Sequence, residues 1–134
     1  MFGGYSYCQE LIDSIEYLEL EDAGSAWQRF RLPNVFTRRR SSVVCGMEQT
    51  GEIIIMGGVG TIDGEIGALY DIIALNTQDN TATVIDDDSE LVASGMAACI
   101  HSHVMIALVD DGDDEFSIIR YSNLTKKLSV LHRF

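Results

Sequence analysis

The chain alternates short apolar runs with polar turn residues along nearly its whole length. The run Ile53-Ile54-Ile55-Met56 is unbroken, which is typical of a strand covered on both faces. The run from Ile15 to Leu20 alternates less regularly, as a half-exposed strand does. Gly, Asn and Asp residues separate the runs, as expected for successive strands and turns. The pattern predicts strands near 13–20, 26–32, 41–47, 52–57, 69–76, 80–86, 95–101, 103–110, 115–122 and 126–134.

An internal repeat supports strands throughout, including segment 9–20, whose apolar stripe is also compatible with a helix. Two apolar runs end in a glycine pair, Gly3-Gly4 and Gly57-Gly58, 54 positions apart. A third run, 103–111, follows at a similar interval and has acids in place of the glycines. A repeat near 50 residues built from short strands is typical of β-propeller blades. Two further sets of residues coincide when the units are aligned: Tyr17, Leu75 and Tyr121, and Trp27, Ala82 and Leu128.

These features resemble the blades of a kelch-repeat protein. A glycine pair closes one strand, an acid opens the next, an aromatic residue or Leu lies within it, an Asn/Asp turn at 76–80 follows, and Trp27 lies in the last strand. The resemblance is good in the second unit and weak in the third. It implies an all-β fold of about two and a half to three four-stranded, kelch-type β-propeller blades, at 1–32, 41–86 and 94–134. The residues assigned to the structural repeat are Gly3, Gly4, Gly57, Gly58, Tyr17, Trp27, Asp13 and Asp71.

The expected number of blades is too small for a closed ring, because propellers typically use 4–8 blades. We therefore expect this incomplete propeller to be part of a longer one. Two alternatives remain open: two copies that complete each other as a homo-oligomer, and an open arc that is stable alone.

Composition narrows the class of partner. The chain has 134 residues, is 46% apolar and carries a net charge of −12. Phosphate contacts need clustered Lys and Arg, so nucleic acid and anionic membrane surfaces are disfavoured as partners. No signal peptide is recognisable at the first residues, which makes the cytoplasm the expected location. Cys8, Cys45 and Cys99 lack CxxC spacing and are interpreted as structural thiols.

No pattern predicts a cofactor, a metal or a catalytic site. His101 and His103 could share a metal on one strand face, but they lack a third ligand nearby and are better interpreted as residues flanking a turn. The acids at 110–115 lack the spacing of a calcium loop. Gly57-Gly58-Val59-Gly60 lacks the Lys-Ser/Thr of a phosphate loop. The sequon at Asn123 is interpreted as incidental.

The kelch resemblance implies a protein-interaction module rather than an enzyme, with inter-strand loops that bind a protein or peptide. The expected binding loops are 5–12, 60–68 and 110–115. For the triplet Arg38-Arg39-Arg40 we prefer a loop whose side-chain stems pack and whose charged heads are solvated, and the kelch resemblance implies a structural role for at least one of the three. The others are candidates for binding an acidic motif, because guanidinium groups bind carboxylates bidentately. A kelch-like enzyme with a metal or sugar site, similar to galactose oxidase or a lyase, remains the alternative function. The residues assigned to partner binding are Arg38, Arg39, Arg40, Tyr5, Asp63 and Glu65.

Overall fold

All regular elements in the described part of the chain are β-strands, which confirms the all-β prediction. The computed structural model describes residues 14–17, 24, 26–31, 37–47, 49–76, 78–79, 81–86, 94–110 and 115–134. Within these residues no helix is long and apolar enough to span a membrane. The strands are β1 (Ser14–Tyr17), β2 (Gln28–Arg31), β3 (Arg39–Arg40), β4 (Val43–Met47), β5 (Glu52–Ile62), β6 (Glu65–Asn76), β7 (Thr81–Asp86), β8 (Ser94–His101), β9 (Val104–Asp110), β10 (Phe116–Ser122) and β11 (Lys127–Arg133).

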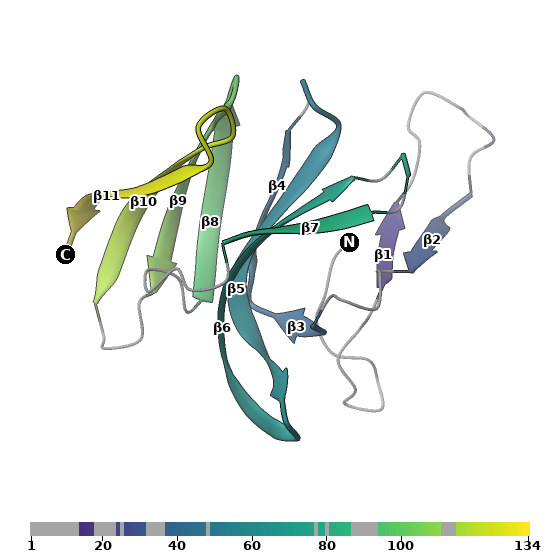
Figure 1. Ribbon diagram of the computed structural model, residues 1–134, viewed down its shortest axis with the longest axis horizontal. Helices are drawn as coiled ribbons and strands as arrows, with labels where there is room; N and C mark the ends of the chain where they lie inside the picture. The colour runs from purple at the N-terminus through teal and green to yellow at the C-terminus, as the bar shows by residue number, and fades with distance from the viewer. Residues whose placement is uncertain are drawn as a thin grey trace.

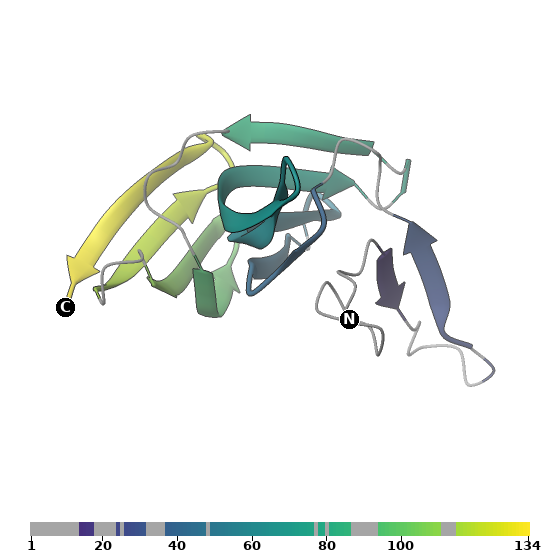
Figure 2. The ribbon, with the colours of Figure 1, turned by 90° about the horizontal axis from the view of Figure 1, so that it is seen from below.

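The strands form three antiparallel sheets in chain order (Figure 1). The first sheet pairs β1 with β2, and the last sheet has the order β8-β9-β10-β11. In the middle sheet β5, β6 and β7 are neighbours, and both β3 and β4 pair with β5, at different points along it. Seen from below, the three sheets follow one another along an arc, with the first and last sheets at opposite ends (Figure 2). Sequential sheets of about four strands are the arrangement of propeller blades.

The main hydrophobic core lies between the middle and last sheets. Strand alternation places every second residue of β4, β5 and β6 on the face toward the last sheet, where β9 and β10 contribute matching residues. Burying each such large side chain contributes roughly 1.5–3 kcal/mol. The buried members of this core are Val43, Met47, Ile54, Met56, Ile72, Ala74, Met105, Ala107, Val109, Ile119 and Tyr121.

The opposite face of the middle sheet carries a second cluster of buried residues, Ile55, Ile73 and Leu75. Ile54, Ile55 and Met56 are all 0% exposed. The unbroken apolar run of β5 is therefore covered on both faces, as its sequence predicts. A blade in the middle of a stack has this property, since it packs against a neighbour on each side.

Segment 14–17 is a strand and not a helix, because β1 pairs antiparallel with β2 from Ser14–Arg31 to Tyr17–Gln28. The aligned repeat positions are cross-strand partners in the two later sheets, where Leu75 faces Ala82 and Tyr121 faces Leu128. In the first sheet Tyr17 faces Gln28, the residue after Trp27. The repeat therefore marks one register position in the hairpins of the two later sheets and is one residue out of register in the first.

Two expectations about the repeat residues are corrected. Trp27, expected to pack between blades, precedes β2 and is 65% exposed. Asp71, expected to open a strand, lies well inside β6, because β6 begins at Glu65. Gly3, Gly4 and Asp13 lie outside the described residues.

The pair Gly57-Gly58 does not end a strand, which corrects a further expectation. It forms a β-bulge within β5, where the pairing with β6 shifts between Met56 and Gly58. Both glycines have positive φ, 54° and 110°. β5 continues for four more residues beyond the pair, because the bulge bends the strand without breaking its pairing with β6. Glycine tolerates this backbone because it has no Cβ.

Candidate functional site

Arg39 is a buried structural residue, which corrects its assignment to partner binding. Its side chain is 0% exposed and its guanidinium forms a bidentate ion pair with Asp71 of β6, in which Nη2 lies 2.8 Å from Oδ2. Nη1 also donates to the carbonyl of Gly57 at 3.0 Å, and Nε donates to the carbonyl of Thr37 at 3.0 Å. Arg39 thus joins β3, the bulge of β5 and β6. Arg39 therefore has the structural role expected for at least one arginine of the triplet.

The bulge is packed tightly against the segment that joins β3 to β4. Ser42 Oγ donates to the carbonyl of Gly57 at 3.0 Å. A Cβ on Gly58 would lie 2.5 Å from Ser42 Oγ and 2.7 Å from the carbonyl oxygen of Arg40. The glycine pair is therefore required both by the backbone conformation and by the close approach of a neighbouring segment.

Residues 60–68 form a β-hairpin and not a loop. β5 and β6 continue toward a two-residue turn at Asp63-Gly64, with φ values of 52° and 88°. Positive φ at both central residues defines a type I′ turn, for which Asp-Gly is a preferred pair. The dipeptide between two alternating apolar runs is a sequence signal for this hairpin that our sequence analysis did not use. Asp63 and Glu65 are exposed at its tip.

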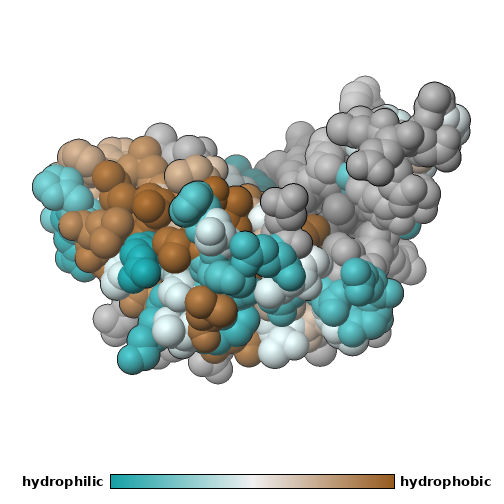
Figure 3. All heavy atoms as spheres, turned by 90° about the horizontal axis from the view of Figure 1, so that it is seen from above, coloured by the Kyte–Doolittle hydropathy of each residue, from teal (hydrophilic) through white to brown (hydrophobic). Residues whose placement is uncertain are grey.

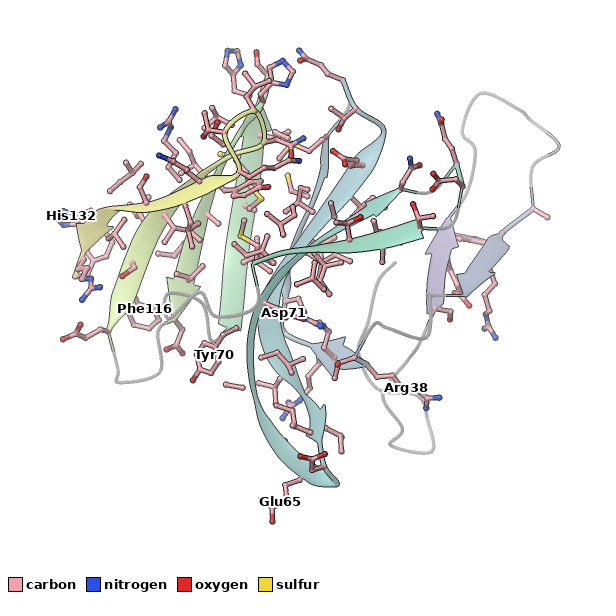
Figure 4. All side chains as sticks on the ribbon, viewed as in Figure 1. Arg38, Glu65, Tyr70, Asp71, Phe116 and His132 are labelled. Atoms are coloured by element: carbon pink, nitrogen blue, oxygen red, sulfur yellow. The ribbon has the colours of Figure 1, made fainter. Side chains whose placement is uncertain are left out.

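Three large apolar side chains are exposed along this hairpin: Ile62 is 46% exposed, Ile66 69% and Tyr70 42%. We call these three residues, together with Arg38, Asp63 and Glu65, the hairpin surface. Figure 4 shows Glu65 at the projecting tip and Arg38 on the side of β3, with Tyr70 on the other side. Arg38 is exposed and Arg40 is half-buried. Ile66 and Tyr70 share one face of β6, whereas Ile62 pairs with Glu65 and lies on the opposite face of the hairpin. Arg38, Asp63 and Glu65 lie beside this hairpin or at its tip, and the sequence analysis missed its exposed apolar residues.

A polar cluster joins the middle and last sheets at the other end of β5. Asn123, 5% exposed, lies in the turn after β10, and its Nδ2 donates to Glu52 Oε2 at 3.1 Å and to Thr50 Oγ1 at 3.5 Å. Lys126 Nζ donates to Asn123 Oδ1 at 2.5 Å and lies 4.0 Å from Glu52 Oε2. Asn123 is therefore an inter-sheet contact, and its buried amide is engaged within the protein rather than free at the surface.

The cluster shifts the pKa values of two groups. The pKa of Glu52 is lowered, mainly by the hydrogen bond from Asn123, against an opposing effect of burial. The pKa of Tyr121 is raised to about 12, first by burial and second by the negative charge of Glu52. The hydroxyl of Tyr121 is buried and has no hydrogen-bond partner among the described residues.

The lowered pKa of Glu52 predicts a loss of stability in acid. A carboxylate whose pKa is lower in the folded state stabilises the fold above its unfolded pKa, about 4.3. This stabilisation is lost as the pH falls through the folded pKa. Urea unfolding at pH 7 and at about pH 3 should show a smaller loss for Glu52→Gln than for the wild type. An equal loss for both proteins would contradict the inter-sheet role of this carboxylate.

The remaining sequence candidates are placed as follows. His101 ends β8 and His103 precedes β9, so the two residues flank the turn at Ser102, as preferred above. Among the described residues no group of three or more His, Cys, Asp or Glu side chains is arranged to hold a metal. Burial, with a smaller effect of Cys99, raises the pKa of the Cys45 thiol. Tyr5, the loop 5–12 and residues 111–114 of the acidic turn lie outside the described residues.

The arc of sequential antiparallel sheets is that of part of a β-propeller, and the structural comparison shows the propeller to be of the kelch type. No protein-family model matches the sequence, and comparison with curated proteins finds no match. Among solved structures 36 chains match the fold. One of them, titled "Structure of YjhT", is a kelch-repeat β-propeller protein that matches with a TM-score of 0.72 and 11% sequence identity. The match covers 91% of this chain and 45% of that chain, and at this identity it shows the fold alone.

Proposed function

We propose that this chain is a kelch-type protein-interaction module that binds a protein or peptide partner through the hairpin surface. The observation that carries the proposal is the exposure of Ile62, Ile66 and Tyr70 on one hairpin. Ile66 and Tyr70 lie on one face of the hairpin and Ile62 on the other. A projecting hairpin with exposed apolar residues on both faces and polar residues at its tip offers a partner both apolar contacts and hydrogen bonds. Arg38, Asp63 and Glu65 supply such polar groups here.

The scaffold supports this role because it presents the hairpin rigidly. The ion pair between Arg39 and Asp71 and the bulge at Gly57-Gly58 lie at the base of the hairpin. A rigid scaffold lowers the entropy that binding must offset. The net charge of −12 favours a partner whose contact surface is basic around an apolar centre.

The test compares partner retention by matched variants. Ile66→Asp places a charge in the apolar part of the hairpin surface, whereas Val84→Asp alters a comparably exposed residue of β7, 48% exposed, outside it. Proteins retained from an extract of the source organism are quantified by mass spectrometry, and the affinity of each is then measured with purified components. We expect Ile66→Asp to weaken binding by about tenfold or more and Val84→Asp to leave it unchanged.

Two checks make the result decisive. Thermal melts should be the same for both variants, because each substitution is at an exposed position. Equal affinity of the wild type and Ile66→Asp for every retained partner would refute the hairpin surface as the binding site. Glu65→Gln should reduce the association rate and its dependence on salt more than it changes the dissociation rate, because it removes an acidic charge that attracts a basic partner at the rim of the interface.

A further inference from the structure

The last sheet carries apolar residues on both faces, but only one face is covered. Met105, Ala107, Val109 and Ile119 point toward the middle sheet and are buried. The residues between them in β9 and β10 point the other way. Ile106 is 40% exposed and Phe116 38%, while Val104, Leu108 and Ile118 are half-buried. We call these five residues the outer face of the last sheet, and Figure 3 shows hydrophobic residues gathered at this end of the molecule.

The side of the last sheet that carries the outer face is mainly apolar. Two charged residues lie on it, Arg120 opposite Ile106 and Asp110 opposite Phe116. The middle sheet also has two apolar faces, and both are buried, since Ile54 on one face and Ile55 on the other are 0% exposed. The outer face therefore resembles a blade surface that lacks its neighbour.

The opposite end of the arc also exposes a large apolar side chain. Trp27, the only tryptophan, directly precedes β2 of the first sheet and is 65% exposed. The first and last sheets lie at the two ends of the arc (Figures 1 and 2). Exposed apolar residues thus occur at both ends of the row of sheets, where a closed propeller has inter-blade contacts.

The length of the YjhT propeller indicates which partner can cover the exposed apolar residues at both ends of the arc of sheets. This chain corresponds to 45% of the YjhT chain, and two copies amount to twice that share, 90%. Two copies related by a two-fold axis bring each last sheet to the first sheet of the other copy, so both ends are covered and no end stays open. Closed two-fold assemblies are the commonest among soluble oligomers.

We propose that a second copy of this chain covers the outer face of the last sheet, so that two copies close one propeller with Trp27 buried near the two junctions. The assembly leaves the hairpin surface of each copy outside the junctions. It is independent of the function proposed above, because either property could exist without the other.

The test measures mass and tryptophan environment on the 134-residue chain. Sedimentation and light scattering over a hundredfold range of concentration give the mass. The emission of Trp27 should shift to the blue as the dimer forms, because the indole leaves water. Ile106→Glu in the outer face should weaken dimerisation by at least about 30-fold and return the emission to longer wavelength. Val84→Glu, a matched charge at an exposed residue of β7, should behave like the wild type.

A second variant changes the residue that the proposal places on the other side of the junction. Trp27→Ala should also weaken the dimer, although β2, which Trp27 precedes, and β9, which contains Ile106, belong to the sheets at opposite ends of one copy. This variant is expected to fold, because the side chain it removes is mostly exposed in the single copy. Circular dichroism and a thermal melt check each variant.

Several results would overturn the proposal. These are a monomer at every concentration, open polymers, aggregates without a cooperative melt, and a dimer that Ile106→Glu does not weaken. A dimer in which Trp27 emission equals that of the monomer would mean that two outer faces pack on each other, and this result too would overturn the two-copy ring.

Discussion

Replacing Arg39 with alanine is expected to lower the free energy of unfolding by about 3–5 kcal/mol, the range found when one partner of a buried ion pair is removed. The guanidinium is fully buried and bonds to the carboxylate of Asp71 and to the carbonyl of Gly57. Its loss leaves the carbonyl of Gly57 and the carboxylate of Asp71, whose side chain is 22% exposed, without the donors of Arg39. A group that stays buried without a partner retains its desolvation cost.

The neighbouring arginine provides the control. Arg38→Ala removes the same charge from an exposed position and should change stability by no more than about 0.5 kcal/mol. Urea unfolding monitored by circular dichroism measures both variants. A double-mutant cycle with Asp71→Ala should show strong non-additivity, because the two single changes break the same pair. A loss below about 1 kcal/mol for Arg39→Ala would contradict the structural role assigned to this residue.

Replacing Gly58 with alanine should cost about 3 kcal/mol or more, from two independent effects. The residue has a φ of 110°, a backbone conformation that residues other than glycine rarely adopt. The new Cβ would also lie 2.7 Å from the backbone oxygen of Arg40, which cannot move away without separating β3 from β5. The bulge and the arginine site beside it should therefore be disturbed together.

Gly46→Ala in β4 is the matched control, because among the described residues no atom beyond its two chain neighbours lies within 4 Å of the position that a new Cβ would take. Gly46 is not among the residues with positive φ. Alanine in this strand should be neutral or slightly stabilising, since it lowers the entropy of the unfolded chain. Comparable stability of the Gly58→Ala and Gly46→Ala proteins would show that the bulge does not need glycine.

Most strands could be predicted from the sequence because their signals are local. Alternation and turn residues located ten of the strands to within a few residues, and the Asn76 turn forms as expected, with the Asn76 side chain accepting a hydrogen bond from the Gln78 amide. The short strand β3 was missed because two residues carry no periodic pattern. The extension of β5 and β6 was missed because the glycine pair was interpreted as a strand end instead of a bulge.

The candidate site was less predictable, because it depends on which side chains face inward. Three consecutive arginines have equal chemistry in the sequence, yet Arg39 is buried while Arg38 is exposed. Only the pairing of β3 with β5 decides this, since it places Arg39 opposite Gly60 and within reach of Asp71, 32 residues away. The inter-sheet contact of Asn123 could not be predicted from the sequence for the same reason, because its partner Glu52 is 71 residues away.

The sequence by itself determined the strand content, the turns and the repeat, and through the repeat it determined the kelch-type blades. These properties depend on alternation and on residues close in the chain, so local physics is sufficient. The tertiary structure alone decided that Arg39 is structural, that Gly57-Gly58 bends a strand, and that Trp27 and the outer face remain exposed. Burial is a property of what packs on a face, and that depends on strand register and on neighbouring sheets far apart in the chain.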